Sequence, residues 1–102
     1  MGAAMGRKPR VHFPGALYHV IVRGNQRQAT FRSDADRRRY LELLNQYRTR
    51  YGFHLYAYVL MSNHVHLLLE VGETPLAKAM QGLQQSYTLY FNRKYQLVGH
   101  LF

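Results

Sequence analysis

The amino-acid sequence predicts an α+β fold, a ferredoxin-like βαββαβ sandwich with two helices on one face of an antiparallel sheet. Two observations predict it: segments in which apolar and polar residues alternate, and segments whose apolar residues recur every three or four positions. They follow one another as strand, helix, strand, strand and helix, over about residues 17–22, 33–50, 53–61, 64–71 and 74–92. Right-handed crossovers place both helices on the same face of the sheet. The last strand of the sandwich is expected to lie beyond Phe102.

The first strand and the first helix have clear boundary signals. Residues 17–22 are rich in β-branched and aromatic side chains, and Gly24-Asn25 ends the strand. Ser33 is suited to cap the helix, because its hydroxyl can accept a bond from a free backbone amide, and Gly52 is suited to end it. The inner face of this helix is expected to carry Tyr40, Leu41, Leu44 and Tyr47.

In the predicted hairpin, the loop length decides which side chains of the second and third strands share a face. A two-residue loop, Ser62-Asn63, sets the apolar face of each strand against the mixed face of the other. A three-residue loop that adds Met61 pairs Tyr58 with His66 and leaves one face wholly apolar. Because a slip of one residue reverses every side chain, the consistent three-residue loop is predicted. The uncovered face is then expected to carry Tyr56, Tyr58, His64 and His66.

The second helix is expected to begin at Thr74 and Pro75, with threonine as the cap and proline at the first helical position. It is expected to end near Asn92. Its apolar stripe consists of Leu76, Met80, Leu83, Tyr87 and Tyr90. Because Tyr87 and Tyr90 belong to this stripe, core packing is the favoured interpretation of both.

Charge indicates the class of partner. The 102 residues include 14 Lys and Arg against 5 Asp and Glu, for a net charge of +9, and 14% of them are aromatic. A domain this basic usually meets a polyanion, so nucleic acid is the expected partner; a merely soluble cationic domain and a ribosome-associated domain are the alternatives. Residues 1–10 are expected to form a basic flexible N-terminal arm, and residues 11–102 a single domain.

Composition excludes several other classes. The chain has no cysteine, which excludes disulfide frameworks, thiolate metal sites and cysteine nucleophiles. No apolar run approaches the ~20 residues that a membrane span needs, so no membrane partner is expected. These features fit a cytoplasmic location.

His64-Val65-His66 is the sharpest local feature of the sequence. Residues two apart on a strand point the same way, with Cα atoms roughly 7 Å apart, so two neutral imidazoles can converge on one divalent metal. Two histidines on a solvated strand face usually have no such role, and the residues alone leave both interpretations open. Glu70 shares the face but lies roughly 13 Å along the strand from His66, too far to complete a site.

Further residues are candidates for contact with nucleic acid. Histidine and arginine side chains of equal parity on the first strand, and polar side chains in the loop after it, can contact phosphate. Tyrosines on the sheet can stack on unpaired bases, although cross-strand packing is an equally good interpretation. The candidates are His19, Arg23, Asn25, Arg27, Tyr56, Tyr58, Arg93 and Lys94. The other histidines, His12, His54 and His100, are interpreted as structural.

Three segments together resemble a known family. They are residues 17–25 (LYHVIVRGN), 61–68 (MSNHVHLL) and 87–92 (YTLYFN). In this order and at this spacing they resemble the single-tyrosine HUH transposases, nearest to the branch of the bacterial REP-associated tyrosine transposases and IS200-like transposases. The resemblance extends from about Pro9 to Phe102.

The resemblance implies a sandwich that binds single-stranded or hairpin DNA as a homodimer in the bacterial cytoplasm, at the nucleoid when bound. It implies that His64 and His66 hold Mg²⁺ or Mn²⁺, which polarises the scissile phosphate. A tyrosine then attacks, forms a 5′-phosphotyrosine link and releases a 3′-hydroxyl, which stores the bond energy for rejoining.

One departure from the family pattern concerns the nucleophile. In the family, the nucleophilic tyrosine and an amide side chain four residues later lie on a helix after the last strand. Both are expected beyond Phe102, so no catalytic tyrosine is assigned here. This chain alone is expected to be inactive, as a fragment or as the product of a gene remnant. The alternative functions are a non-cleaving module that binds DNA hairpins and a small RNA-binding sandwich.

Overall fold

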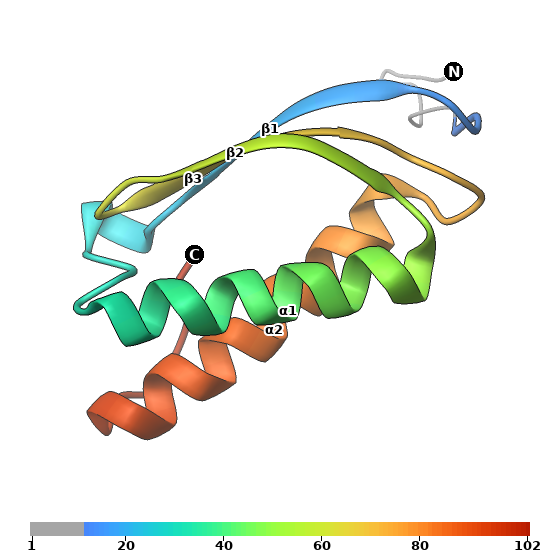
Figure 1. Cartoon of the computed structure of the whole chain (residues 1–102). Helices are drawn as coiled ribbons and strands as arrows, with labels where there is room; N and C mark the ends of the chain where they lie inside the picture. Colours follow the sequence, from blue (N-terminus) through green and yellow to red (C-terminus); the bar gives the residue numbers. More distant parts are fainter. Residues whose placement is uncertain (1–11) are drawn as a thin grey trace, which may run out of the picture.

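Two α-helices cover one face of a three-stranded antiparallel sheet (Figure 1). The computed structural model describes residues 12–102, so the predicted arm over residues 1–10 lies outside the described residues. The strands are β1 (Leu17–Arg23), β2 (His54–Leu60) and β3 (His64–Glu70), and the helices are α1 (Asp34–Tyr51) and α2 (Leu76–Tyr95). A short 3-10 turn, η1 (Asn25–Arg27), follows β1.

The strand order is β1-β3-β2, and β3 pairs antiparallel with both neighbours. This sheet and its helical layer confirm the predicted α+β fold, and they are compatible with a truncated ferredoxin-like arrangement. Among residues 12–102, the outer edges of β1 and β2 have no strand partner. No helix in this part of the chain is both long and apolar enough to cross a membrane.

The helix ends follow local chemistry. At the start of α1, Ser33 Oγ accepts a hydrogen bond from the Asp36 amide at 3.2 Å, as predicted, and Gly52 ends the helix in the left-handed conformation. Pro75 is the N-cap of α2 rather than its first helical residue. The helix continues to Tyr95, past the end predicted near Asn92, because its last turn is bonded to α1.

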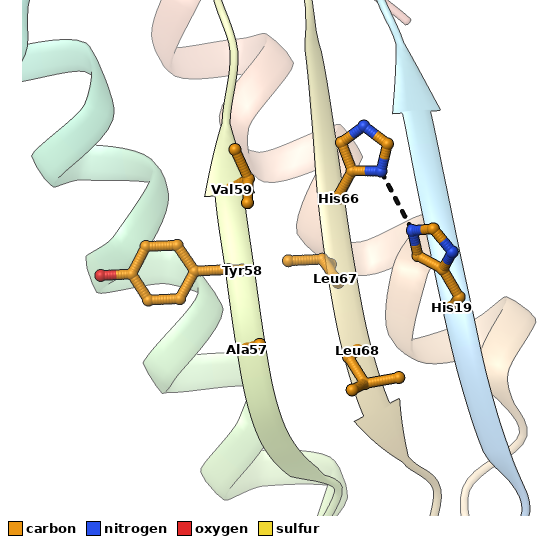
Figure 2. A pocket seen from close by; sticks show the side chains of 7 residues that line it. All are labelled: His19, Ala57, Tyr58, Val59, His66, Leu67 and Leu68. Carbon is orange, nitrogen blue, oxygen red and sulfur yellow. Dashed lines mark hydrogen bonds between the residues drawn. The ribbon is translucent and has the colours of Figure 1, made fainter.

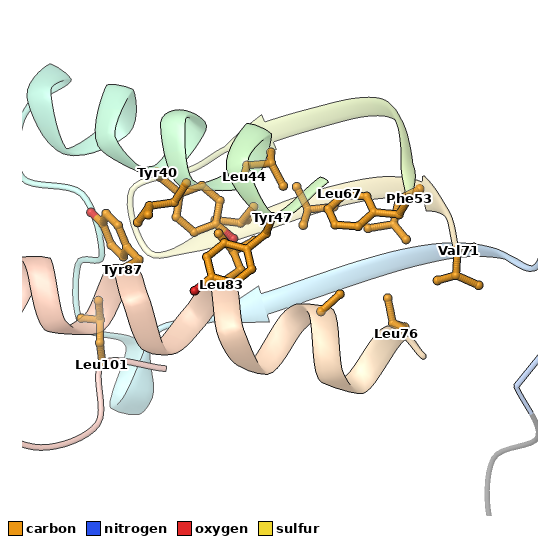
Figure 3. Close-up of a cluster of buried hydrophobic side chains, with 14 of the residues drawn as sticks. Tyr40, Leu44, Tyr47, Phe53, Leu67, Val71, Leu76, Leu83, Tyr87 and Leu101 are labelled. Carbon is orange, nitrogen blue, oxygen red and sulfur yellow. The ribbon is translucent and has the colours of Figure 1, made fainter. Parts of the chain in front are cut away.

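The core lies between the sheet and the helices (Figure 3). The alternate residues Val65, Leu67 and Leu69 of β3 are fully buried, which confirms the predicted apolar side of that strand. The helices add the predicted Tyr40, Leu44, Tyr47, Leu76, Leu83 and Tyr87, together with Leu43 and Phe91, which the sequence pattern did not single out. Burying one side of the sheet leaves the other side uncovered, which we call the open sheet face.

The register between β2 and β3 corrects the predicted hairpin. Val59, not Tyr58, lies opposite His66, so the loop is the two-residue Ser62-Asn63 instead of the predicted three-residue loop. Directly opposed residues share a face of the sheet, which places Val59 beside the histidines. Tyr58 lies opposite the buried Leu67 and therefore belongs to the helix-facing side, at the edge of the sheet.

A β-bulge allows the two-residue loop. The register shifts by one residue between Leu55 and Ala57, with Tyr56 as the extra residue. Leu55 therefore packs against the core on one side of the bulge and Leu60 does so on the other. A strict alternation along β2 would have exposed one of these two leucines, which is why the sequence pattern favoured the wrong loop.

A buried carboxylate joins the start of α1 to the end of α2. Asp36 is fully buried and accepts hydrogen bonds from Lys94 Nζ at 2.7 Å, Tyr90 Oη at 2.8 Å, Tyr95 Oη at 2.5 Å and the Arg32 amide at 2.9 Å. Burial alone would raise the pKa of Asp36, but these donors outweigh it and hold the pKa well below its usual range. Asp36 thus stays charged and fixes how the helices meet.

Replacing Asp36 is expected to lower the stability of the fold. In Asp36→Asn the ion pair with Lys94 is lost, which should reduce the free energy of unfolding by roughly 3 kcal/mol. Because the folded pKa of Asp36 is depressed, its contribution is present above the unfolded pKa of about 3.9 and is lost as the pH falls. Urea denaturation from neutral to acid pH should show a steep loss for the wild type and a flatter profile for Asp36→Asn. An equal change in Asp34→Asn, an exposed acid of the same helical turn, would contradict this.

Candidate functional site

The histidine pair, His64 and His66, lies on the open sheet face. Both residues alternate with the buried side of β3, and their rings lie 4.9 Å apart between centroids. Residues two apart on a strand share a face, so the fold presents the two imidazoles side by side, away from the helices. This is the arrangement that the sequence predicted for them.

A third histidine joins the pair from β1. His19 Nε2 lies 3.0 Å from His66 Nδ1, and the two rings stack with centroids 5.2 Å apart (Figure 2). On the other side of the pair, His64 Nδ1 lies 2.9 Å from Asn63 Oδ1. The sequence placed His19 on the same face but did not foresee its bond to His66.

Basic side chains lie around His66. Arg23 lies directly opposite His64 in the sheet and so belongs to the same face. Partial desolvation, followed by Coulombic repulsion from His64, His19 and Arg23, lowers the pKa of His66 below its usual value. A lowered pKa favours the neutral ring, which is the form of imidazole that binds a metal ion.

A shallow apolar hollow of about 290 Å³ adjoins the histidines (Figure 2). Its lining consists of His19, Ala57, Tyr58, Val59, His66, Leu67 and Leu68. Val59 is 50% exposed and Leu68 37% exposed, so apolar side chains remain open to solvent beside polar rings. An apolar floor next to imidazoles suits the flat face of an aromatic ligand.

The loop after β1 brings Asn25 and Arg27 to the same end of the sheet. Gly24 donates to Asn63 O at 2.8 Å, next to His64, and a Cβ at Gly24 would lie 2.2 Å from Gln28 O. Only glycine therefore fits this junction. Arg27 has a left-handed φ of 62°, which is uncommon for a residue with a side chain.

The sequence predicted that Tyr56 and Tyr58 of β2 share one face of the sheet, but the structure separates them. Tyr56, at the bulge, donates from Oη to Glu70 Oε1 at 2.7 Å, and the residue is 59% exposed. Tyr58 is directed outward past the edge of β2 and away from β3 (Figure 2), so its predicted place on the histidine face is wrong. Glu70 is engaged by Tyr56 at the far end of β3 and does not join the histidines, as expected from its spacing.

The predicted contacts Arg93 and Lys94 are not brought to the histidines. Both belong to the last turn of α2, in the helical layer, whereas the histidine pair faces away from that layer. Lys94 is held by Asp36, and Arg93 is exposed. Their charge therefore lies on the other side of the molecule.

The tyrosines of α2 are committed to packing and to hydrogen bonds within the helical layer. Tyr87 is fully buried and donates to Thr30 O at 2.6 Å, and burial, followed by the charge of Asp36, raises its pKa well above the usual value. Tyr90 and Tyr95 donate to Asp36. The core interpretation is confirmed for Tyr87, whereas Tyr90 is partly buried and packs against the core.

Among the described residues, the remaining histidines share no hydrogen bond or ring contact with the pair. His54 begins β2 opposite Glu70, at the far end of the sheet from His64. His12 precedes β1 and is partly buried, and the carbonyl of His100 accepts a bond from Gln28. Within residues 12–102, no group of three His, Cys, Asp or Glu side chains is placed to hold a metal ion.

Three residues at the site or next to it carried little sequence signal. Asn63 orients His64, and its place directly before the histidine in a hairpin loop was the available clue. Val59 enters the hollow through the bulge, which the pattern of β2 did not reveal. Gln28 donates to Leu101 O at 3.1 Å, a contact across 73 residues that local reasoning does not find.

Fold and site together define an α+β sheet protein with a histidine pair on the open face of its central strand. A family model described as "Transposase IS200 like" matches residues 13–102. The chain belongs to this family of IS200-like transposases, which confirms the resemblance seen in the sequence. A search of curated proteins found no match.

Removing the charge of Glu70 is expected to lower the pKa of Tyr56. The hydrogen bond to Glu70, with smaller effects of desolvation and of the carboxylate charge, raises the pKa of Tyr56 above 10.0. In Glu70→Gln the pKa of Tyr56 should therefore fall towards that value. Titration of its ¹³Cζ resonance by NMR measures this change. Glu73→Gln, which removes an exposed acid just after β3, should leave the resonance unchanged, and a Tyr56 pKa that ignores Glu70→Gln would exclude the bond in solution.

Proposed function

We propose that this transposase-family chain binds single-stranded DNA, or the unpaired part of a DNA hairpin, over the open sheet face. The observation that carries the proposal is the histidine pair on an uncovered strand, flanked by Arg23 and by an apolar hollow. Membership of the IS200-like transposases supports a role in DNA transposition.

Phosphate contact is assigned to the cations at the histidine end of the sheet. Arg23 is exposed beside His64, and Arg27 follows in the turn after β1. Glu70, the acid of the open face, lies at the opposite end of β3. A strand that follows the cations therefore passes over the histidine pair, and the net charge of +9 favours its approach.

Base contact is assigned to the hollow beside His66. Its floor of Ala57, Val59 and Leu68 can accept the face of one unpaired base, while the rings of His19 and His66 form its polar border. Paired bases expose edges instead of faces, so this surface favours unpaired nucleotides.

The histidine pair is the proposed holder of Mg²⁺ or Mn²⁺. The donor set fits in part: two neighbouring imidazoles, one of them with a lowered pKa, supply neutral nitrogen ligands. A bound metal would polarise the phosphate at which the strand is cut. The chain's own contribution is to hold the ion on the face where the DNA lies.

Strand cleavage and rejoining through a 5′-phosphotyrosine is the proposed chemistry of the complete family site. Tyr87, Tyr90 and Tyr95 do not supply the nucleophile in this proposal, because their hydroxyl groups are bonded within the helical layer. Action as a homodimer is part of the same proposal.

DNA affinity should depend on Arg23. In Arg23→Ala, loss of one phosphate contact should weaken binding of a fluorescent single-stranded oligonucleotide and reduce the slope of log affinity against log salt concentration by about 0.7. Fluorescence anisotropy over a salt series measures both. The control is Arg38→Ala, an exposed arginine of α1 in the helical layer. Equal losses in the two variants, or tighter binding of an RNA of the same sequence, would overturn the proposed surface.

Metal affinity should depend on His64. In His64→Ala the affinity for Mn²⁺ should fall by at least about tenfold, because even residues that only orient ligands contribute that much. The measurement is the free Mn²⁺ signal in electron paramagnetic resonance during titration of the metal. His54→Ala is the matched control, since His54 lies on the same sheet at its far end. Unchanged Mn²⁺ binding in His64→Ala would refute the metal role.

A further inference from the structure

The Nδ1 atoms of the histidine pair are both occupied by neighbours. His64 Nδ1 lies 2.9 Å from Asn63 Oδ1, and His66 Nδ1 lies 3.0 Å from His19 Nε2. An imidazole has two nitrogens, and in its neutral form one donates while the other accepts. The partner at Nδ1 therefore determines what the other nitrogen, Nε2, can do.

For His64 the tautomer follows from its partner. An amide oxygen only accepts hydrogen bonds, so the bond to Asn63 Oδ1 requires a proton on His64 Nδ1. Nε2 of the neutral ring then carries the lone pair. His64 is thus prepared to bind a cation through Nε2.

For His66 the partner allows two arrangements. Either His66 Nδ1–H donates to His19 Nε2, or His19 Nε2–H donates to His66 Nδ1. Only the first leaves a lone pair on Nε2 of His66, and it makes this ring equivalent to that of His64. His19 then carries its own proton on Nδ1.

We propose that His19 and Asn63 are positioning residues for the histidine pair. Each accepts a hydrogen bond from an Nδ1–H, so that both ligands of the proposed metal site present Nε2. This inference rests on the proposed metal role of the pair. It assigns to His19 the orientation of a ligand, in addition to its place at the border of the hollow.

The sheet explains why His19 is suited to this role. Ile21 lies directly opposite His66, and His19 is its neighbour on the same face, so the two imidazoles meet diagonally and stack at 26°. His19 is exposed and lies outside the core. Its replacement should therefore change the site without unfolding the protein.

The first test reads the tautomers directly. Two-bond ¹H–¹⁵N correlation spectra of the metal-free chain, recorded about two pH units above the usual histidine pKa of about 6.5, distinguish protonated from unprotonated ring nitrogens. The expected result is a protonated Nδ1 and an unprotonated Nε2 in both His64 and His66. A protonated Nε2 in His66 would overturn the role of His19, and in His64 that of Asn63.

The second test measures Mn²⁺ affinity by the same free-metal signal. His19→Leu removes the acceptor and should weaken binding about 10- to 100-fold, whereas His19→Gln, whose amide oxygen can replace Nε2, should retain most of it. Asn63→Ala and Asn63→Asp form the corresponding pair. His54→Leu and His54→Gln are the matched controls on the same sheet, and thermal unfolding checks the fold of each variant.

The outcomes separate this inference from the proposed function. Wild-type chain that binds Mn²⁺ through His64, together with unaltered binding in His19→Leu and Asn63→Ala, would overturn the positioning role alone. Equal losses in His19→Leu and His19→Gln would also overturn it, because they indicate His19 as a ligand. Absence of wild-type Mn²⁺ binding would refute the metal role itself, and with it the inference that depends on that role.

Discussion

The central strand β3 imposes the main constraint on this molecule. It is hydrogen-bonded on both sides, and its alternate residues Val65, Leu67 and Leu69 are sealed under the helices. The residues between them therefore face the opposite, open side of the sheet. The histidine pair thus owes its position to core packing, because any shift that turned the rings inward would expose three buried aliphatic side chains. Hydrophobic burial on one side of the sheet places the polar chemistry on the other.

Much of the fold was predictable, because its signals are local. Ser33 caps the start of α1 and Gly52 ends it, as the sequence predicted. The side of β3 that carries the histidines follows from the alternation of apolar and polar residues alone. The hairpin loop was predicted wrongly, because alternation assumes one register along a whole strand. The bulge at Tyr56 lets β2 use two registers, so that Leu55 and Leu60 both pack against the core. This arrangement depends on pairing with β3, which cannot be deduced from the sequence of β2 alone. The same error placed Tyr58 on the wrong face.

The candidate site was predictable only as a set of residue types. Parity put His19, Arg23 and the histidine pair on one surface, but the bond between two imidazoles depends on strand order and diagonal register. Lys94 shows the opposite case. Its charge suggested a nucleic-acid contact, and no local pattern revealed the buried Asp36, 58 residues away, that binds it. A count of Lys and Arg in the sequence is therefore larger than the number of these side chains that are available to bind a ligand.

The carbonyl of Leu101 connects the end of the described chain to the turn that follows β1. It accepts a bond from the Asn25 amide at 2.7 Å and another from the Gln28 side chain, while the Leu101 side chain is itself buried. The end of the described chain thereby retains the turn that carries Arg27. A change that displaces Leu101 would consequently alter the turn that carries Arg27, at the histidine end of the sheet.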